Sequence, residues 1–183
     1  MHPAASYRHD VVIPSADFSL PALYEALDAQ RVERALSWAA VAREVSRRFA
    51  EGPARAVSTS TITGVRSRSV VEGDGVLQML LWLDRSPESF VPGHPLGEDP
   101  TARLVDPGHG NVLRWDAGVL RAALDLRRTD LSLTWAAVAE QVGCSATHLT
   151  GLRTGVRVTL PFVLRPITWL GRPANAFTHA TPW

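Results

Sequence analysis

The sequence predicts an all-α fold in which two tandem domains of five short helices are joined by a linker rich in proline and glycine. Apolar residues recur three and four positions apart, as on one side of a helix, and no alternating run of β-branched residues indicates a strand. A long internal repeat divides the chain in two. With 183 residues, 45% of them hydrophobic, the chain has enough apolar material for two small cores.

The repeat consists of two segments with the same order and spacing. Residues 26–45 (ALDAQRVERALSWAAVAREV) align with residues 123–142 (ALDLRRTDLSLTWAAVAEQV) at an offset of 97. The alignment then resumes at an offset of 87, where STITGVR (60–66) matches THLTGLR (147–153) and WLDRSPESF (82–90) matches WLGRPANAF (169–177). The first copy therefore contains ten extra residues, within about 46–56. Conserved order, spacing and tryptophans indicate a tandem duplication.

The domain boundaries follow from this repeat and from the composition between the copies. Residues 91–111 (VPGHPLGEDPTARLVDPGHGN) are dense in proline and glycine, which is typical of a linker. We expect an N-terminal tail (1–17), a first domain (18–91) with a long turn near 46–56, a linker (92–111) and a second domain (112–183).

The first two helices of each copy are predicted from apolar spacing and from N-cap residues. Pro21 suits a first helical turn, and Asp116 is the expected N-cap of the matching helix. The apolar positions of these first helices are Leu20, Leu23, Leu27, Val32 and Leu36, and Val119, Leu120, Leu124 and Leu131. Ser37 and Thr134 precede the identical WAAVA segments, where a hydroxyl group caps a second helix.

The remaining helices follow in the same order in both copies. Ser58 and Ser145 begin a short third helix whose inward residues are Ile62 and Val65, or Leu149 and Leu152. The apolar residues of the fourth helix are Val76, Leu77, Leu80, Leu81 and Leu83, matched by Val163, Leu164, Ile167 and Leu170. Short elements around Phe90 and Phe177 close each bundle. Pro166 should kink or shorten the fourth helix of copy two, because proline lacks a backbone donor.

Two stretches carry a resemblance to a known family. LSWAAVAREV followed by VSTSTITGVRSR, and LTWAAVAEQVGCSATHLTGLRTG, resemble the lambda-repressor-like (Cro/cI-type, xenobiotic-response-element) helix-turn-helix family. Gly143 lies where the family's turn favours a glycine with positive φ. Copy one departs from the pattern, since its turn (SRRFAEGPARAV) is long and is expected to prolong the second helix through Phe49.

The resemblance implies that the third helix of each copy enters the DNA major groove. The base-facing positions it implies are Thr59, Ser60, Thr63 and Gly64 in copy one, and Ala146, Thr147, Thr150 and Gly151 in copy two, with His148 beside them. Ser58 and Ser145 would cap the helix and bind phosphate. The arginines implied to contact phosphates or adjacent bases are Arg47, Arg48, Arg55, Arg66, Arg68, Arg153 and Arg157. Trp38 and Trp135 are interpreted as packing residues, with an indole N–H contact to phosphate as the alternative.

Charge is distributed unevenly between the copies. All 19 basic residues are arginines, against 18 acidic residues. Residues 18–91 contain nine arginines and nine acids, whereas residues 112–183 contain eight arginines and four acids, a net charge of +4. Arginine binds phosphate and guanine in a bidentate manner that lysine cannot match, so a net charge near zero does not exclude DNA.

Several classes of protein are excluded by the sequence. No apolar stretch of about 18 residues predicts a membrane span, and the N-terminus lacks the order of a secretory signal. Cys144 is the only cysteine, so no internal disulfide forms and a reducing cytoplasm is the expected location. The six histidines lack ligand spacing, and no phosphate loop or catalytic triad pattern is present. We therefore expect no metal, no cofactor and no enzymatic activity.

These observations predict a cytoplasmic, sequence-specific double-stranded DNA-binding protein, in the role of a transcriptional regulator. Two linked helix-turn-helix modules would act as a pseudo-dimer on an asymmetric site, because their base-facing residues differ. The alternative is a protein-interaction adaptor or antitoxin-like module in which one or both domains have lost DNA binding. A mixed case, in which one module binds DNA and the other holds a homodimer mate or a second protein, stays open.

Overall fold

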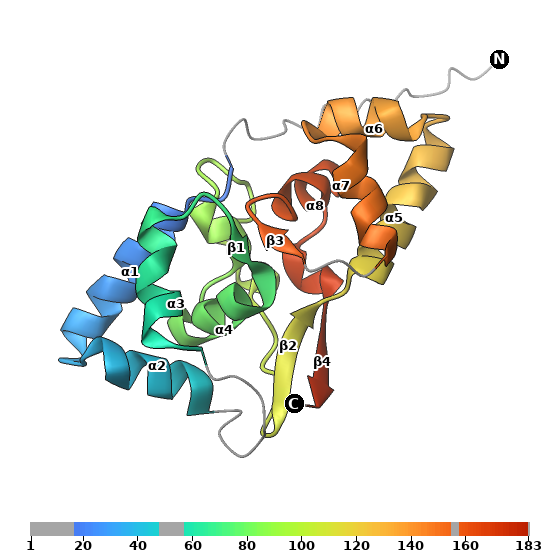
Figure 1. Cartoon of the computed structure of the whole chain (residues 1–183). Helices are drawn as coiled ribbons and strands as arrows, with labels where there is room; N and C mark the ends of the chain where they lie inside the picture. The colour runs from blue at the N-terminus through green and yellow to red at the C-terminus, as the bar shows by residue number, and fades with distance from the viewer. Residues whose placement is uncertain (1–16, 48–56, 155–157, 183) are drawn as a thin grey trace.

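The computed structural model describes residues 17–47, 57–154 and 158–182, and these residues are mostly helical (Figure 1). Their α-helices are α1 (Leu20–Glu33), α2 (Trp38–Ser46), α3 (Thr59–Thr63), α4 (Gly73–Leu83), α5 (Ala117–Asp130), α6 (Trp135–Val142), α7 (Ala146–Gly151) and α8 (Leu164–Leu170). Short 3₁₀ helices at Pro87–Phe90 and Ala174–Phe177 follow α4 and α8. Among the described helices, none has both the length and the apolar character that crossing a membrane requires.

Two small antiparallel sheets correct the prediction of a fold without strands. Strand β1 (Val71–Glu72) pairs with β3 (Thr159–Leu160), and β2 (Asn111–Trp115) pairs with β4 (Thr178–Pro182). Strands β1 and β3 have only two residues each, β2 has a burial pattern that does not alternate, and β2 begins inside the expected linker. Their partners lie 60 or more residues away in the sequence. Local periodicity carries no signal for such distant pairing.

The helix starts agree with the predicted caps. The side chains of Ser37, Ser58, Asp116, Thr134 and Ser145 each accept a hydrogen bond from a backbone N–H in the first turn of the helix that follows. Such a bond satisfies one of the donors that every helix leaves unpaired at its N-terminus.

The predicted core is largely, but not fully, buried. Leu20, Leu23 and Leu27 of α1 are buried, and so are most of the apolar residues predicted for the third and fourth helices. The exceptions are Val32, Val119 and Leu131, whose exposed fractions are 60%, 46% and 50%. Val32 and Leu131 lie near helix C-termini and Val119 in the first turn of α5, where an apolar stripe meets solvent. Leu36, Leu81 and Leu152 are half-buried.

Gly143 and Pro166 have the predicted effects on the backbone. Gly143 is the C-cap of α6 with φ of 71°, a conformation that residues with a Cβ rarely adopt. Helix α8 has 7 residues, whereas α4 has 11. Because α8 begins at Leu164, Pro166 lies in its first turn, where no intrahelical donor is lost. The proline therefore shortens the helix from its N-terminal end.

Matching positions of the two sequence copies make matching contacts. The backbone N–H of Ser19 donates to Phe90 O (2.8 Å), and that of Asp116 donates to Phe177 O (2.7 Å). The indole N–H groups of the tryptophans in the fourth helices donate to the second helices, Trp82 to Glu44 (2.9 Å) and Trp169 to Gln141 (3.0 Å). The two copies therefore share hydrogen bonds at equivalent positions as well as sequence. The second helix of copy one ends at Ser46 in α2, and residues 48–56 of the predicted long turn lie outside the described residues.

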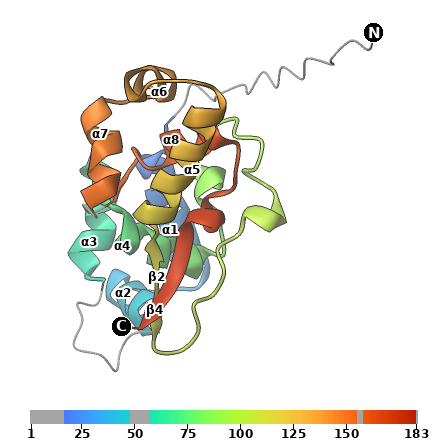
Figure 2. The ribbon, with the colours of Figure 1, turned by 90° about the vertical axis from the view of Figure 1, so that its right-hand side faces the viewer.

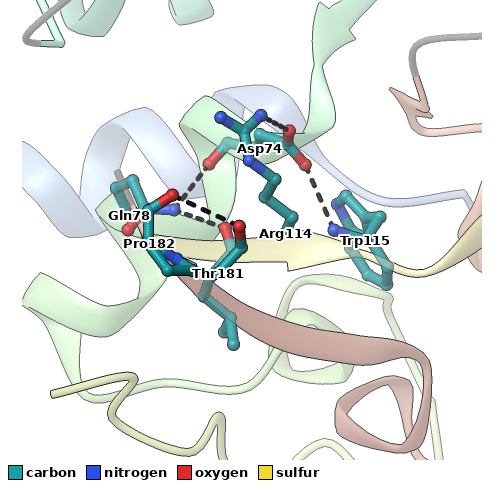
Figure 3. A network of polar contacts seen from close by, with 7 residues as sticks. Asp74, Gln78, Arg114, Trp115, Thr181 and Pro182 are labelled. Carbon is teal, nitrogen blue, oxygen red and sulfur yellow. Dashed lines mark hydrogen bonds and ion pairs between the residues drawn. The ribbon is translucent and has the colours of Figure 1, made fainter. Parts of the chain in front are cut away.

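Polar contacts join β2 to α4, which belongs to the other half of the chain (Figure 3). Asp74 accepts from Arg114 Nη1 (2.9 Å) and from the backbone N–H of Trp115 (3.1 Å). The amide of Gln78, which is buried, donates to Leu113 O (2.8 Å). These bonds hold the strand across the helix.

Glu88 is a buried carboxyl between the two halves, and it predicts a pH dependence of stability. Its Oε1 accepts from the backbone N–H of Ala174 (2.5 Å), while Oε2 has no partner among the described residues. Burial raises the pKa of Glu88 above its usual range. The folded protein therefore holds the proton of Glu88 more tightly than the unfolded chain does. The stability that the protonated carboxyl contributes is greatest at low pH and is lost as the pH rises through the raised pKa.

Glu88→Gln is therefore expected to increase the free energy of unfolding by about 1 kcal/mol at pH 8, because the neutral amide avoids burying a charge. At pH 4 the gain should shrink, since the wild-type carboxyl is then protonated. Urea unfolding of both proteins at the two pH values measures the difference. A variant that is destabilised more at pH 8 than at pH 4 would contradict this account of Glu88.

Candidate nucleic-acid interface

Helix α3 presents a row of small hydroxyl side chains to solvent. Ser58 caps it by accepting from the N–H of Thr61 (3.1 Å), and its hydroxyl also contacts Ser60 Oγ (2.9 Å). Thr59 and Ser60 are exposed, and Thr63 is partly exposed with its Oγ1 donating to Thr59 O (3.0 Å). Ile62 points inward and anchors the helix to the core. The outer side of α3 therefore has no bulky group, which allows close approach of a partner.

Helix α7 repeats this arrangement with different outer residues. Ser145 accepts from the N–H of His148 (3.3 Å), and Thr150 Oγ1 donates to Ala146 O (3.0 Å), as Thr63 does to Thr59. Ala146 and Thr147 are exposed. Leu149 is the buried anchor, in the place of Ile62.

His148 differs from its counterpart in copy one. Its Nδ1 lies 2.9 Å from Ser145 Oγ, and its ring stacks on Phe162 with centroids 4.7 Å apart. The ring therefore lies against the protein rather than extending away from α7. Thr61 occupies the matching position in α3 and contacts Ser58 Oγ (2.8 Å). The group of copy two best suited to base recognition is thus partly engaged within the protein.

Arginines follow both helices. Arg66 is exposed, with its guanidinium 5.6 Å from the ring centroid of Tyr24, and its repeat counterpart Arg153 is also exposed. Arg68 is exposed, and its guanidinium lies beside Gly64. Arg47 follows α2 and is exposed. Of the remaining predicted positions, Gly64 and Gly151 are half-buried, and Arg48, Arg55 and Arg157 lie outside the described residues.

The exposed arginines near α3 and α7 have no carboxylate partner. Among described residues, Arg47, Arg66, Arg68 and Arg153 form no ion pair with a carboxylate, and the same holds for the exposed Arg43, Arg85 and Arg172 elsewhere. Carboxylates pair with Arg31, Arg34, Arg103, Arg114, Arg128 and Arg165. A guanidinium without a carboxylate partner can bind a phosphate without first breaking an internal contact.

The two tryptophans at the start of the second helices are packed against cations and rings. Trp38 stacks on Tyr24 (5.4 Å between centroids) and lies under Arg31. Trp135 contacts two arginines, Arg121 at 3.3 Å and Arg128 at 5.2 Å from its ring centroid. Both indoles are half-buried, in agreement with a packing role. Arg121 occupies the position that Tyr24 has in copy one. The sequence alignment shows this exchange of residues, but it does not show that Arg121 forms a cation–π contact with Trp135.

Cys144 is half-buried beside the turn between α6 and α7, and burial raises the pKa of its thiol. This disfavours the reactive thiolate, so Cys144 suits a packing role. Within the described ranges, no group of three or more His, Cys, Asp or Glu side chains forms a metal-binding cluster.

The structure adds the relative placement of the two helices. Figure 2 shows α3 and α7 on the same side of the molecule, with the segment that contains the 3₁₀ helix Pro100–Ala102 on the opposite side. No sequence signal gives this placement, because it depends on the pairing of β1 with β3 and on the contacts of β2. We name the surface formed by residues 58–68 and 145–153 the α3/α7 surface.

The chain was compared with models of known protein families, with curated proteins and with solved structures. None of these comparisons returned a match. Any functional assignment therefore depends on the α3/α7 surface and on the resemblance carried by the sequence motifs.

Proposed function

We propose that this protein is a sequence-specific double-stranded DNA-binding transcriptional regulator with two lambda-repressor-like helix-turn-helix domains in one chain. The observation that carries the proposal is the α3/α7 surface. It contains two short, serine-capped helices with matching hydrogen bonds on one side of the molecule, each followed by exposed arginines. Covalent linkage would replace the dimerisation on which single-module repressors depend.

The chemistry of the surface suits close contact with base edges. Threonine and serine hydroxyls donate or accept with any base, and the methyl groups of threonine and alanine pack against thymine. Thr63 and Thr150 use their hydroxyl hydrogen within their own helices, so each oxygen is left to accept from a base. Arg66 and Arg153 would contact phosphates. We expect modest discrimination by direct contacts, with DNA shape adding specificity.

Removal of the matched arginines tests the phosphate contacts. Arg66→Ala together with Arg153→Ala is expected to weaken DNA binding about tenfold or more and to reduce the salt slope of log K by about 2, one per lost phosphate contact. Fluorescence anisotropy with a labelled duplex over a salt series measures both quantities.

The control is Arg85→Ala with Arg103→Ala, which removes the same charge. Arg103 follows the 3₁₀ helix on the opposite side of the molecule and pairs with Asp84, next to Arg85. This control should retain nearly wild-type affinity. If the two double variants bind DNA equally well, Arg66 and Arg153 do not contact phosphate.

One observation favours the alternative, a protein-interaction adaptor. A cavity of about 340 Å³ adjoins α7, and its lining is mainly apolar. Half-buried Leu152, Val158 and Phe162 contribute to this lining. A partner could insert an apolar side chain there. Unchanged DNA affinity in the Arg66→Ala/Arg153→Ala variant would favour this alternative over DNA binding.

A further inference from the structure

The pairing of β1 with β3 has a symmetry that the repeat makes visible. At the offset of 87 that relates the third and fourth helices of the two copies, Glu72 corresponds to Thr159, and these two residues are direct partners in the sheet. The contacts on either side exchange when the copies are exchanged: Val71 pairs with Leu160, and Gly73 N–H donates to Val158 O (2.8 Å). An antiparallel pair centred on equivalent residues is unchanged by a rotation of 180°.

A second set of contacts shows the same reciprocity away from the strands. Arg114 and Asp17 correspond at the offset of 97, and each lies just before the first helix of its copy. Arg114 pairs with Asp74 in α4 of the other copy (2.9 Å), and Asp17 accepts from Arg165 Nε in α8 of the other copy (2.6 Å). The charges are reversed between the two pairs, yet each copy uses the same region to contact the same helix of its neighbour. This is an isologous interface within one chain.

The arrangement of helices agrees with such an axis. In Figure 1, α1 and α5 lie on opposite flanks, α2 lies at the lower left, α6 at the upper right, and β1 and β3 meet between the halves. In Figure 2, seen from the side, α3 and α7 lie on one side of the molecule. The layout in Figure 1 is that expected for a two-fold axis along the viewing direction, about which the two sets of helices exchange places.

From these contacts we infer that a pseudo-two-fold axis through the β1–β3 pair fixes α3 and α7 relative to each other, so that one chain contacts two half-sites in inverted orientation. The inference rests on the proposed DNA binding. Head-to-tail domains on a free linker would accept direct repeats and several spacings. A two-fold arrangement requires half-sites that run in opposite directions at one spacing.

Wild-type half-sites differ in sequence because α3 and α7 differ, and this hides their orientation. The test therefore makes the outer residues of the two helices identical. Ala146→Thr, Thr147→Ser and His148→Thr give α7 the outer residues of α3. All three positions are exposed, and threonine at 148 can contact Ser145 as Thr61 contacts Ser58. The converse variant, Thr59→Ala, Ser60→Thr and Thr61→His, is the second arm in case the first does not fold.

Bound sequences are selected from a random duplex pool with the wild-type chain and with each triple variant. We expect a non-palindromic motif for the wild type and a palindrome with one fixed spacing for each variant, bound by one chain per duplex in native mass spectrometry. A direct repeat, variable spacing or two chains per palindrome would overturn the two-fold inference while DNA binding stands. If the wild-type chain selects no sequence, the proposed function itself fails.

Discussion

Replacing Thr59 and Ala146 together by glutamate is expected to lower the affinity for DNA about 100-fold or more, because two carboxylates would face phosphates and base acceptors. Both positions are exposed and are the first residues of α3 and α7. An acidic residue there interacts favourably with the helix N-terminus, so the fold should be retained. Loss of binding would therefore report on the interface and not on stability.

Val105→Glu is the control for a carboxylate added away from the α3/α7 surface, one charge against the two of the double variant. Val105 has an exposed fraction of 70% and follows the 3₁₀ helix that lies opposite the α3/α7 surface in Figure 2. This variant should bind DNA within about twofold of the wild type, since a single rim or distant charge acts mainly through screened, long-range forces. Anisotropy titrations with the selected duplex, accompanied by thermal melts, compare the two. If the double variant and the control bind DNA with equal affinity, α3 and α7 do not contact DNA.

Gly73→Ala is expected to reduce the free energy of unfolding by about 2–3 kcal/mol, because the new methyl group has no space. A Cβ at this first residue of α4 would lie 2.6 Å from Trp115 Nε1 and 2.9 Å from Val158 O. Both atoms belong to the other half of the chain, and Trp115 is buried. The variant would therefore force apart β2, β3 and α4.

Gly75→Ala provides a matched control two residues further along α4. No heavy atom lies within 4 Å of a Cβ built at Gly75. Alanine has the higher helix propensity, so this variant should gain about 0.5–1 kcal/mol. Urea unfolding followed by tryptophan fluorescence measures both changes. Equal stability of the two variants would contradict the close packing of Gly73 against the second half.

The parts of the fold that sequence predicts well are those determined locally. Capping hydroxyls, the turn at Gly143 and the shortening caused by Pro166 each depend on a few neighbouring residues, and all agree with the structure. Val32 and Leu131 fit the helical period but are exposed, because periodicity does not state where the core ends. The four strands were missed for a different reason, since the pairing of Glu72 with Thr159 depends on how two distant segments dock.

In the candidate site, too, some features follow from the local sequence and others depend on distant contacts. The exposure of Thr59, Ser60, Ala146 and Thr147 follows from the amphipathic pattern around Ile62 and Leu149. The stacking of His148 on Phe162 does not follow from this pattern. Phe162 lies beyond α7, and the matching position in copy one, Gly75, has no aromatic ring. The common side of α3 and α7 depends on the docking of the two halves and required the structure.

Selection of bound duplexes from a random pool by the wild-type chain tests the central claim most directly, because both the length and the content of the motif report how many helices contact DNA. We expect a motif with two different half-sites whose centres are about one helical turn, about 10 base pairs, apart. Its binding should weaken steeply with salt. No enriched sequence at low salt would contradict DNA binding, and a single short half-site would contradict the use of both α3 and α7.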